Sequence, residues 1–186
     1  MIPFSVITLG HLVSPNSAST ALKSFANFYH TITSKHQRRV KLYIVDESAN
    51  NDMLHKQCLE QEIGDVTTIL NLSEQETIES IYKSGSVFFL PVKENKDALV
   101  QESLSYGLPF IGFTKYGYEE YIDQTCGMLL KEERDEENVI EFARLLQLLY
   151  FDPEARNFLK RGAVNKYEAA FSWGKDSRSG RSRASY

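Results

Sequence analysis

Short apolar runs alternate with longer segments of helical periodicity along this chain, and this alternation limits the fold more than any other feature. Because strands that are separated by helices are joined by crossovers, they pair in parallel. We therefore predict an α/β fold, a three-layer Rossmann-like domain with a parallel sheet over residues 1–174. The predicted strands are 4–10, 40–45, 65–70, 86–91, 109–113 and 127–130, and the predicted helices are about 18–34, 52–61, 74–83, a short one before Gly107, 135–150 and 153–171.

Local signals predict where several of these helices begin and end. Ser73 and Glu76 have the spacing of a capping box, which would open the helix over 74–83. Gly64 and Gly107 stand where helical patterns stop, and glycine favours the end of a helix.

The charge and cysteine content exclude several kinds of partner. The chain has 186 residues and a formal net charge of −4, with no basic cluster in its body, so nucleic acid is not expected as a partner. Cys58 and Cys126 lack metal-ligand spacing, and we expect free thiols in a cytoplasmic protein. The Ser/Arg/Gly-rich stretch 175–186 is expected to be a disordered tail.

An acidic stretch follows the apolar run Val87–Pro91, with Glu94, Asp97 and Glu102 in a strand-to-helix segment. Open α/β sheets bind ligands at the carboxyl ends of their strands, and N–H groups at a helix start attract phosphate. A carboxylate one or two turns further can accept hydrogen bonds from a pair of sugar hydroxyls. The alternative is two solvated glutamates beside a helix, with Asp97 as its N-cap.

The spacing of Glu94 and Glu102, closed by Gly107-Leu108-Pro109, resembles the E-x7-E motif of retaining glycosyltransferases with the GT-B fold, the group 1 family. Other segments resemble the same family in the same order. They are the strand at 41–45, the base-facing strand and loop 65–73, the Gly-x-x-Glu segment 116–122, the Gly-Leu-Leu-like strand 125–130 and the final Phe171-Ser172-Trp173.

The resemblance implies the C-terminal, nucleotide-sugar-binding half of a GT-B enzyme. The implied activity moves a sugar from a nucleotide-sugar to a hydroxyl acceptor with retained configuration, a hexosyltransferase type of reaction in glycan or polysaccharide biosynthesis. Glu94 would be the catalytic residue facing the donor sugar, and no metal or other cofactor is required. The implied donor-binding residues are Glu102 at the ribose hydroxyls, the amides of Asp97, Ala98 and Leu99 at the phosphate or sugar, Asn71 and Leu72 near the base, and His11 and Asn16 in the first loop.

The sequence departs from the family where the donor's diphosphate would be neutralised. His11 and Asn16 stand where the family has Arg and Lys, and Asp97 replaces a glycine. Val45-Asp46-Glu47-Ser48 stands where the family tends to have a glycine-rich turn. We therefore expect the diphosphate to bind weakly. Lys93, Lys96 or Lys115 would restore only part of the missing positive charge.

The family's enzymes have two Rossmann-like domains, so the expected partners are a nucleotide-sugar and a missing N-terminal acceptor domain or partner subunit. The chain alone is expected to be inactive, and the intact enzyme to lie in the cytoplasm or at the inner face of the membrane. One alternative is a catalytically degenerate GT-B domain that serves assembly or carbohydrate recognition. Another is a sugar-nucleotide epimerase of GT-B fold. The chain carries no P-loop, G-x-G-x-x-G fingerprint or G-x-S-x-G elbow.

Overall fold

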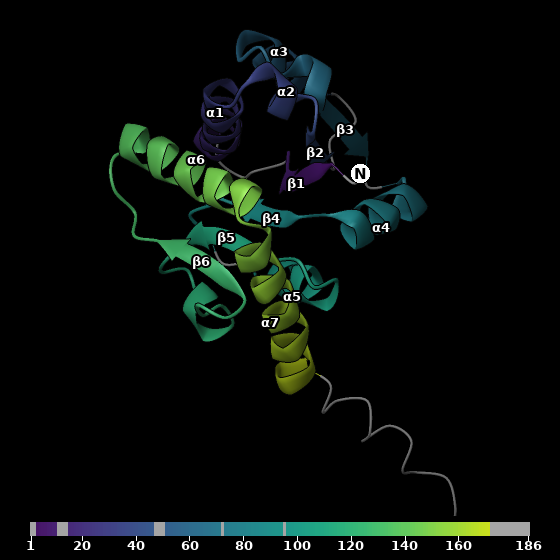
Figure 1. Ribbon diagram of the computed structural model, residues 1–186, viewed down its shortest axis with the longest axis vertical. Helices are drawn as coiled ribbons and strands as arrows, with labels where there is room; N and C mark the ends of the chain where they lie inside the picture. Colours follow the sequence, from purple (N-terminus) through teal and green to yellow (C-terminus); the bar gives the residue numbers. More distant parts are fainter. Residues whose placement is uncertain (1–2, 11–14, 47–50, 72, 95, 172–186) are drawn as a thin grey trace, which may run out of the picture.

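The computed structural model describes residues 3–10, 15–46, 51–71, 73–94 and 96–171. They form a six-stranded sheet in the order β3-β2-β1-β4-β5-β6, and all pairs of neighbouring strands are parallel (Figure 1). The predicted fold class is confirmed, whereas the predicted tail 175–186 lies outside the described residues. The strands are β1 (Phe4–Leu9), β2 (Val40–Asp46), β3 (Thr67–Asn71), β4 (Val87–Leu90), β5 (Phe110–Phe113) and β6 (Gly127–Leu130).

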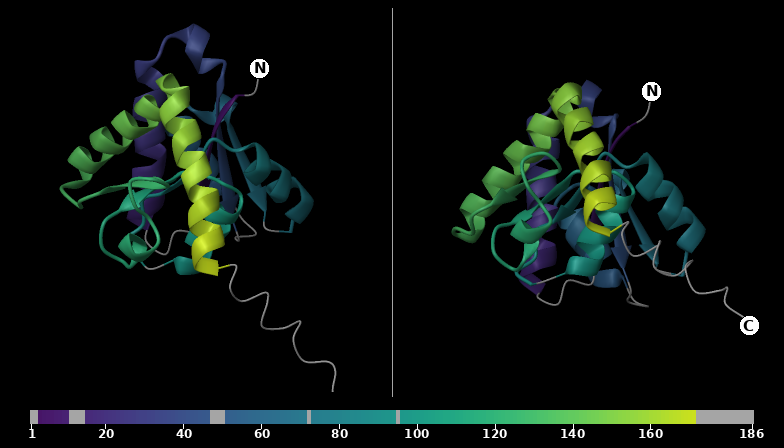
Figure 2. Two further views of the ribbon diagram at one scale, coloured as in Figure 1. Left: turned by 60° about the horizontal axis from the view of Figure 1, so that its bottom comes forward. Right: turned by 90° about the horizontal axis from the view of Figure 1, so that it is seen from below.

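Helices cover both faces of the sheet and form the outer two of three layers (Figure 2). α1, α3 and α6 pack on one face, and α4 and α5 pack on the other. α7 contributes Leu159 to the first core and Ala163 to the second, so it bridges the two layers. The helices are α1 (Pro15–Thr31), α2 (Ser34–Gln37), α3 (Asp52–Glu60), η1 (Gly64–Val66), α4 (Gln75–Ser84), α5 (Asp97–Ser105), η2 (Tyr118–Glu120), α6 (Asp135–Phe151) and α7 (Pro153–Phe171).

The two cores follow from the alternation of side chains along each strand. In β1, Phe4 and Val6 belong to the core under α1 and α6, whereas Ile7 and Leu9 belong to the core under α4 and α5. All four residues of β4 are buried, because a central parallel strand is covered on both sides. This is why the apolar run 87–90 shows no polar alternation.

Three predicted helix ends are wrong in detail. The capping box of Ser73 and Glu76 is not formed: Glu74 is the N-cap of α4, and its Oε1 accepts a hydrogen bond from the Asn71 amide at 3.0 Å. Helix α3 ends before Glu62, which has a positive φ of 56°, and Gly64 instead begins η1. Asp97 is the first residue inside α5 rather than its N-cap, which is Lys96. The short helix α2 was not expected at all.

The direction in which the chain adds strands to the sheet reverses between β1 and β4, and this reversal marks the expected place for a ligand. β1 pairs with β2 on one side and with β4 on the other. The connections that leave the carboxyl ends of β1 and β4 therefore turn to opposite sides and leave a crevice between them. Ligands of open α/β sheets bind in this crevice, and the acidic stretch after β4 lies beside it.

Candidate functional site

The loop from β4 to α5 brings Glu94 to the carboxyl edge of the sheet. After β4 the chain stays buried through Val92, and it then reaches the surface at Lys93 and the partly exposed Glu94. The Glu94 carbonyl accepts a hydrogen bond of 2.6 Å from the hydroxyl of Tyr118, a residue with no exposed surface. The position of Glu94 is thus fixed by a buried phenol from the segment after β5.

A strained turn places Tyr118 beneath this loop. Lys115, Tyr116 and Gly117 have positive φ values of 74°, 60° and 88° in succession. Such a conformation is costly for residues other than glycine, and it is typical of functional sites, where surrounding contacts hold it. Here the Lys115 amide donates to the carboxylate of Glu119, which closes the turn.

Two of the three lysines expected to supply positive charge near Glu94, Lys93 and Lys96, are already engaged with carboxylates. Lys96 Nζ lies 3.1 Å from Glu94 Oε2. Lys93 Nζ contacts Glu132 Oε1 at 2.7 Å, and Glu132 also accepts a hydrogen bond of 2.7 Å from the Tyr116 hydroxyl. The hydrogen bond from Lys93, followed by that from Tyr116, holds the pKa of Glu132 below its usual value. Lys93 therefore contributes its charge to Glu132 and not to a ligand at Glu94.

Glu102 lies in different surroundings, in a hollow of about 190 Å³ between α4 and α5. Tyr82 and Tyr106 line the hollow with it, and their rings meet edge to face at 5.3 Å. Partial burial raises the pKa of the Glu102 carboxyl although its outer side meets solvent. Glu94 does not line this hollow, so Glu94 and Glu102 occupy separate neighbourhoods.

The first turn of α5 begins next to Glu94. The Leu99 amide donates to the carbonyl of Lys96 at 2.9 Å, and so does the amide of Val100 at 3.1 Å. Of the three amides that the sequence suggested for phosphate, that of Leu99 is thus used inside the helix. The amides of Asp97 and Ala98 are the remaining candidates at this helix start.

The other suggested donor-binding residues are spread along the same edge. Asn71 ends β3, and its side-chain oxygen accepts a hydrogen bond of 3.0 Å from the Ser73 amide. β3 is three strands away from β4, which corresponds to about 14 Å, a span suited to an extended ligand of linked rings and phosphates. Asn16 is the second residue of α1, whereas its side chain, His11 and Leu72 lie outside the description.

Gly10 lets the ends of β1 and β2 approach closely at the crevice. Its amide donates to Val45 at 2.8 Å, and a Cβ at this position would lie 2.9 Å from Cβ of Asp46. Asp46 itself is only 1% exposed, so the edge carries a buried carboxylate where the family tends to have glycine.

Sequence reasoning missed the tyrosines of the site. Tyr118 holds the loop of Glu94, and Tyr82 and Tyr106 surround Glu102. Burial, followed by the charges of Asp97 and Glu94, raises the pKa of Tyr118, so its hydroxyl remains a donor at neutral pH. No sequence pattern links these tyrosines to the glutamates, and only the fold shows which of them meet.

Two properties of the described residues bear on other kinds of site. Within residues that the structure describes, no three His, Cys, Asp or Glu side chains are grouped so as to hold a metal ion. None of the described helices is both long and apolar enough to cross a membrane.

Comparison with known proteins points to one family. The family model described as "Glycosyl transferases group 1" matches residues 3–165. A search of curated protein sequences finds no match.

Solved structures with a similar fold include three glycosyltransferases at 13–17% sequence identity. The pneumococcal O-GlcNAc transferase GtfA, in complex with UDP and GlcNAc, has a TM-score of 0.72 and 17% identity, over 95% of this chain and 36% of that one. WaaG, a glycosyltransferase involved in lipopolysaccharide biosynthesis, has a TM-score of 0.75 and 13% identity, over 95% and 46%. The C-terminal domain of LpcC, a group 1 family protein from Francisella tularensis, has a TM-score of 0.68 and 14% identity, over 91% and 88%. The chain thus spans less than half of GtfA and WaaG.

Proposed function

The chain belongs to the glycosyl transferases group 1 family, and we propose that it forms the nucleotide-sugar-binding domain of a retaining glycosyltransferase. One observation carries the proposal: Glu94 and the start of α5 lie together at the carboxyl end of β4, beside the crevice between β1 and β4. GtfA, which has the same fold here, was solved with UDP and GlcNAc.

The proposed reaction breaks the bond between the anomeric carbon of the donor sugar and its phosphate oxygen. A bond from that carbon to the acceptor's hydroxyl oxygen forms on the same face, the hydroxyl proton passes to an oxygen of the departing phosphate, and the nucleoside diphosphate leaves. Glu94 would face the donor sugar, and the first amides of α5 would stabilise the charge that grows on the leaving phosphate. These groups are fixed before the ligand arrives, because Tyr118 holds the Glu94 loop.

Glu102 would bind the ribose of the donor. A carboxylate accepts two hydrogen bonds from a vicinal diol, and partial burial strengthens such bonds. The nearby rings of Tyr82 and Tyr106 limit water on one side of the carboxylate. The base would then lie towards the end of β3, near Asn71.

The acceptor site is proposed to belong to a further domain or a partner subunit, because this chain spans less than half of GtfA and WaaG. The assembled enzyme would be a cytoplasmic hexosyltransferase of glycan or polysaccharide biosynthesis that needs no metal. On this proposal the 186-residue chain transfers no sugar by itself. A turnover assay with mixed nucleotide-sugars tests this, and Glu94-dependent transfer by the purified chain would contradict it.

Calorimetric titration with UDP and GDP tests the donor site directly. Replacing Glu102 by alanine removes its charge-assisted contact to the ribose, and the loss of even one such hydrogen bond, worth roughly 1.5–3 kcal/mol, should lower affinity by about tenfold to a hundredfold. The matched control is Glu137→Ala, which removes an exposed carboxylate of α6 that pairs with Arg134. Tight UDP binding that Glu102→Ala leaves unchanged would place the nucleotide elsewhere.

A catalytically degenerate domain is the second candidate, and the ion pair of Lys93 with Glu132 favours it. In that pair the charge of Lys93 is neutralised by Glu132, at the edge where a diphosphate would need a cation. Asp97 adds a negative charge at the same edge. A degenerate domain would bind neither UDP nor GDP at millimolar concentration, and the chain combined with its acceptor half would still transfer nothing.

A further inference from the structure

A second pocket opens at the amino ends of β1 and β4, on the edge of the sheet opposite to Glu94. It has a volume of about 510 Å³ and lies where the start of β1, α2, the turn between α4 and β4, and the junction of α6 with α7 meet. Figure 1 shows α6 and α7 joined by a sharp turn at this junction. The volume falls within the range of about 300–1,000 Å³ found for small-molecule sites.

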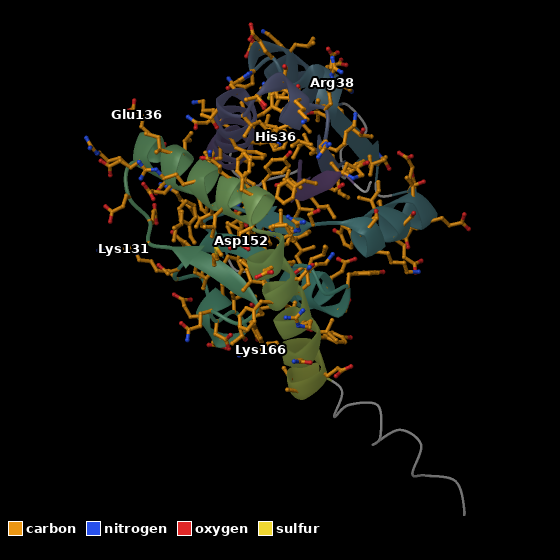
Figure 3. The ribbon with its side chains drawn as sticks, viewed as in Figure 1. His36, Arg38, Lys131, Glu136, Asp152 and Lys166 are labelled. Carbon is orange, nitrogen blue, oxygen red and sulfur yellow. The ribbon has the colours of Figure 1, made fainter. Side chains whose placement is uncertain are left out.

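The pocket is cationic although the whole chain has a net charge of −4. Arg39, Lys83, Arg156 and Lys160 line it together with His36, and no Asp or Glu is among the described residues of its lining. Two acids lie close to lining residues, and each has a partner of its own. Glu79 pairs with Lys83, and Asp152, at the turn between α6 and α7 (Figure 3), accepts a hydrogen bond from the Ala155 amide at 2.9 Å.

Two of these cations are partly buried on one face of α7. Arg156 and Lys160 are one turn apart, so their side chains neighbour each other. Lys160 Nζ donates to the Gly85 carbonyl at 2.8 Å, and the Arg156 guanidinium lies 5.4 Å from the centre of the Phe4 ring and donates to the Leu149 carbonyl. These bonds orient the two groups and use only some of their donors, because an ammonium has three N–H groups and a guanidinium has five.

Holding the two positive charges of Arg156 and Lys160 together in a partly buried position costs free energy. Burial lowers the pKa of Arg156, and burial followed by the charge of Arg156 lowers the pKa of Lys160. A bound anion would offset this repulsion, and a guanidinium fork matches the oxygens of a phosphate.

An aromatic wall stands beside the cations. Phe151 is 52% exposed, and its ring meets that of Tyr150 edge to face at 4.8 Å. The Tyr150 hydroxyl is 2.7 Å from Nδ1 of His36, which fixes the tyrosine at the pocket. A ligand that combines an anionic group with a flat or apolar part would use both sides of the pocket.

We propose that this pocket binds a phosphate-bearing small molecule, with its phosphate oxygens against Arg39, Arg156 and Lys160 and its apolar part against Phe151. The site is separate from the donor site, because it lies at the opposite ends of the strands. It does not depend on sugar transfer, and a failure of the donor-site experiments would leave it standing.

Calorimetric titration with sodium pyrophosphate and with AMP tests the pocket. The double variant Arg39→Gln/Lys160→Gln should weaken binding of each probe by about a hundredfold, since one charge-assisted hydrogen bond corresponds to about tenfold or more. The matched control, Lys131→Gln/Arg134→Gln, removes the same charge from the segment between β6 and α6 and should change nothing. Amide NMR shifts on titration should centre on Gly85 and Ser86, and they should persist in Glu102→Ala.

Two further measurements distinguish a lipid headgroup from a free metabolite as the source of the phosphate, and show whether a variant loses binding through misfolding. Binding to phosphatidylcholine vesicles only when they contain phosphatidic acid, lost in the double variant, would identify a lipid headgroup as the phosphate source. Binding of the soluble probes alone would identify a free metabolite. Because Lys160 also bonds Gly85, the single variant Arg39→Gln at an exposed position should still weaken binding about tenfold at an unchanged melting temperature. The proposal is overturned if neither probes nor vesicles bind, or if the variants bind like the wild type.

Discussion

The two edges of the sheet carry opposite side-chain charges. The carboxyl edge holds Glu94, Asp97 and the buried Asp46, whereas the amino edge gathers Arg156 and Lys160. In a parallel α/β sheet the crossover helices begin at the carboxyl edge and end at the amino edge, so their dipoles are positive at the first and negative at the second, whereas α7 begins at the amino edge. The side chains thus offset the dipoles of the crossover helices at both ends.

The comparison shows that the two edges would bind phosphate in different ways. At the carboxyl edge, a diphosphate would compete with Glu94 for the charge of Lys96. It would also compete with Asp97 for the positive end of the α5 dipole. At the amino edge, cations line a pocket whose described lining contains no carboxylate. The edge proposed for the donor is therefore the less cationic of the two.

Adding cations to the carboxyl edge should produce the largest change. In the double variant His11→Arg/Asn16→Lys we expect UDP affinity to rise by about two to four powers of ten, because two charged contacts to the diphosphate are restored. Calorimetric titration measures this. The control is Lys56→Arg on exposed α3, which should leave UDP affinity unchanged. An unchanged affinity in the double variant would mean that the donor site is not a family site that has lost two cationic residues.

Disturbing the packing of α7 at the amino edge should have the next largest effect. A Cβ on Gly162 would lie 1.7 Å from the Thr125 carbonyl oxygen, and backbone at this position cannot move cheaply. We expect Gly162→Ala to lower the free energy of unfolding by about 3 kcal/mol, despite the better helix propensity of alanine. Denaturant unfolding tests this, with Asn165→Ala at an exposed position of α7 as the control. Equal stability of the two variants would show that α7 sits further from the sheet.

Loosening the acidic loop should have a smaller effect. Tyr118→Phe removes the hydrogen bond to the Glu94 carbonyl and leaves that group without this donor, which should cost about 1–2 kcal/mol of stability. UDP affinity should fall with it, because the loop would lose its fixed position. Tyr121→Phe, in the same segment, is the comparison, and melting curves with and without UDP give both quantities. A Tyr118→Phe protein that retains full stability and affinity would contradict the role of this bond.

The smallest expected effect concerns Asp123, which joins the β5–β6 segment to α7. Hydrogen bonds from Lys166 and Thr125 lower the pKa of Asp123 to about 2. Because its folded pKa lies below the unfolded value, this contribution is complete above about pH 4 and is lost as the pH falls towards 2.

Asp123→Asn should therefore destabilise the protein at pH 7 by about 1 kcal/mol, a value reduced for solvent screening because the side chain is 44% exposed. The difference from the wild type should vanish by about pH 2 in pH-dependent denaturation. Asp65→Asn in η1 serves as the control, and a difference independent of pH would argue against the ion pair.

The layered fold could be predicted because strand and helix periodicities are local properties of the sequence. The run 87–90 and the helices 135–151 and 153–171 follow from their own residues. The capping box of Ser73 and Glu76 failed because Glu74 bonds the Asn71 amide instead, a choice that depends on how β3 ends.

The sites were harder to foresee, since they join distant residues. Glu94 stood out by its place after a strand, but Tyr118 reaches it only through a strained turn. The amino-edge pocket combines α2, α4 and α7, and no short pattern links Arg39 with Lys160. The charge at an edge of the sheet can be assigned only when the order of the strands is known, because that order decides which loops lie together.

The loop of Glu94 is tied to its neighbours at two positions, and this affects the thermodynamics and kinetics of binding. Tyr118 holds the Glu94 carbonyl, and Glu132 holds Lys93 while accepting a bond from Tyr116. Because these contacts hold Lys93 and Glu94, these two residues have less conformational entropy to lose when a ligand arrives. Association at this part of the site should then follow single-exponential kinetics with a rate proportional to ligand concentration, and no slow ordering step should follow.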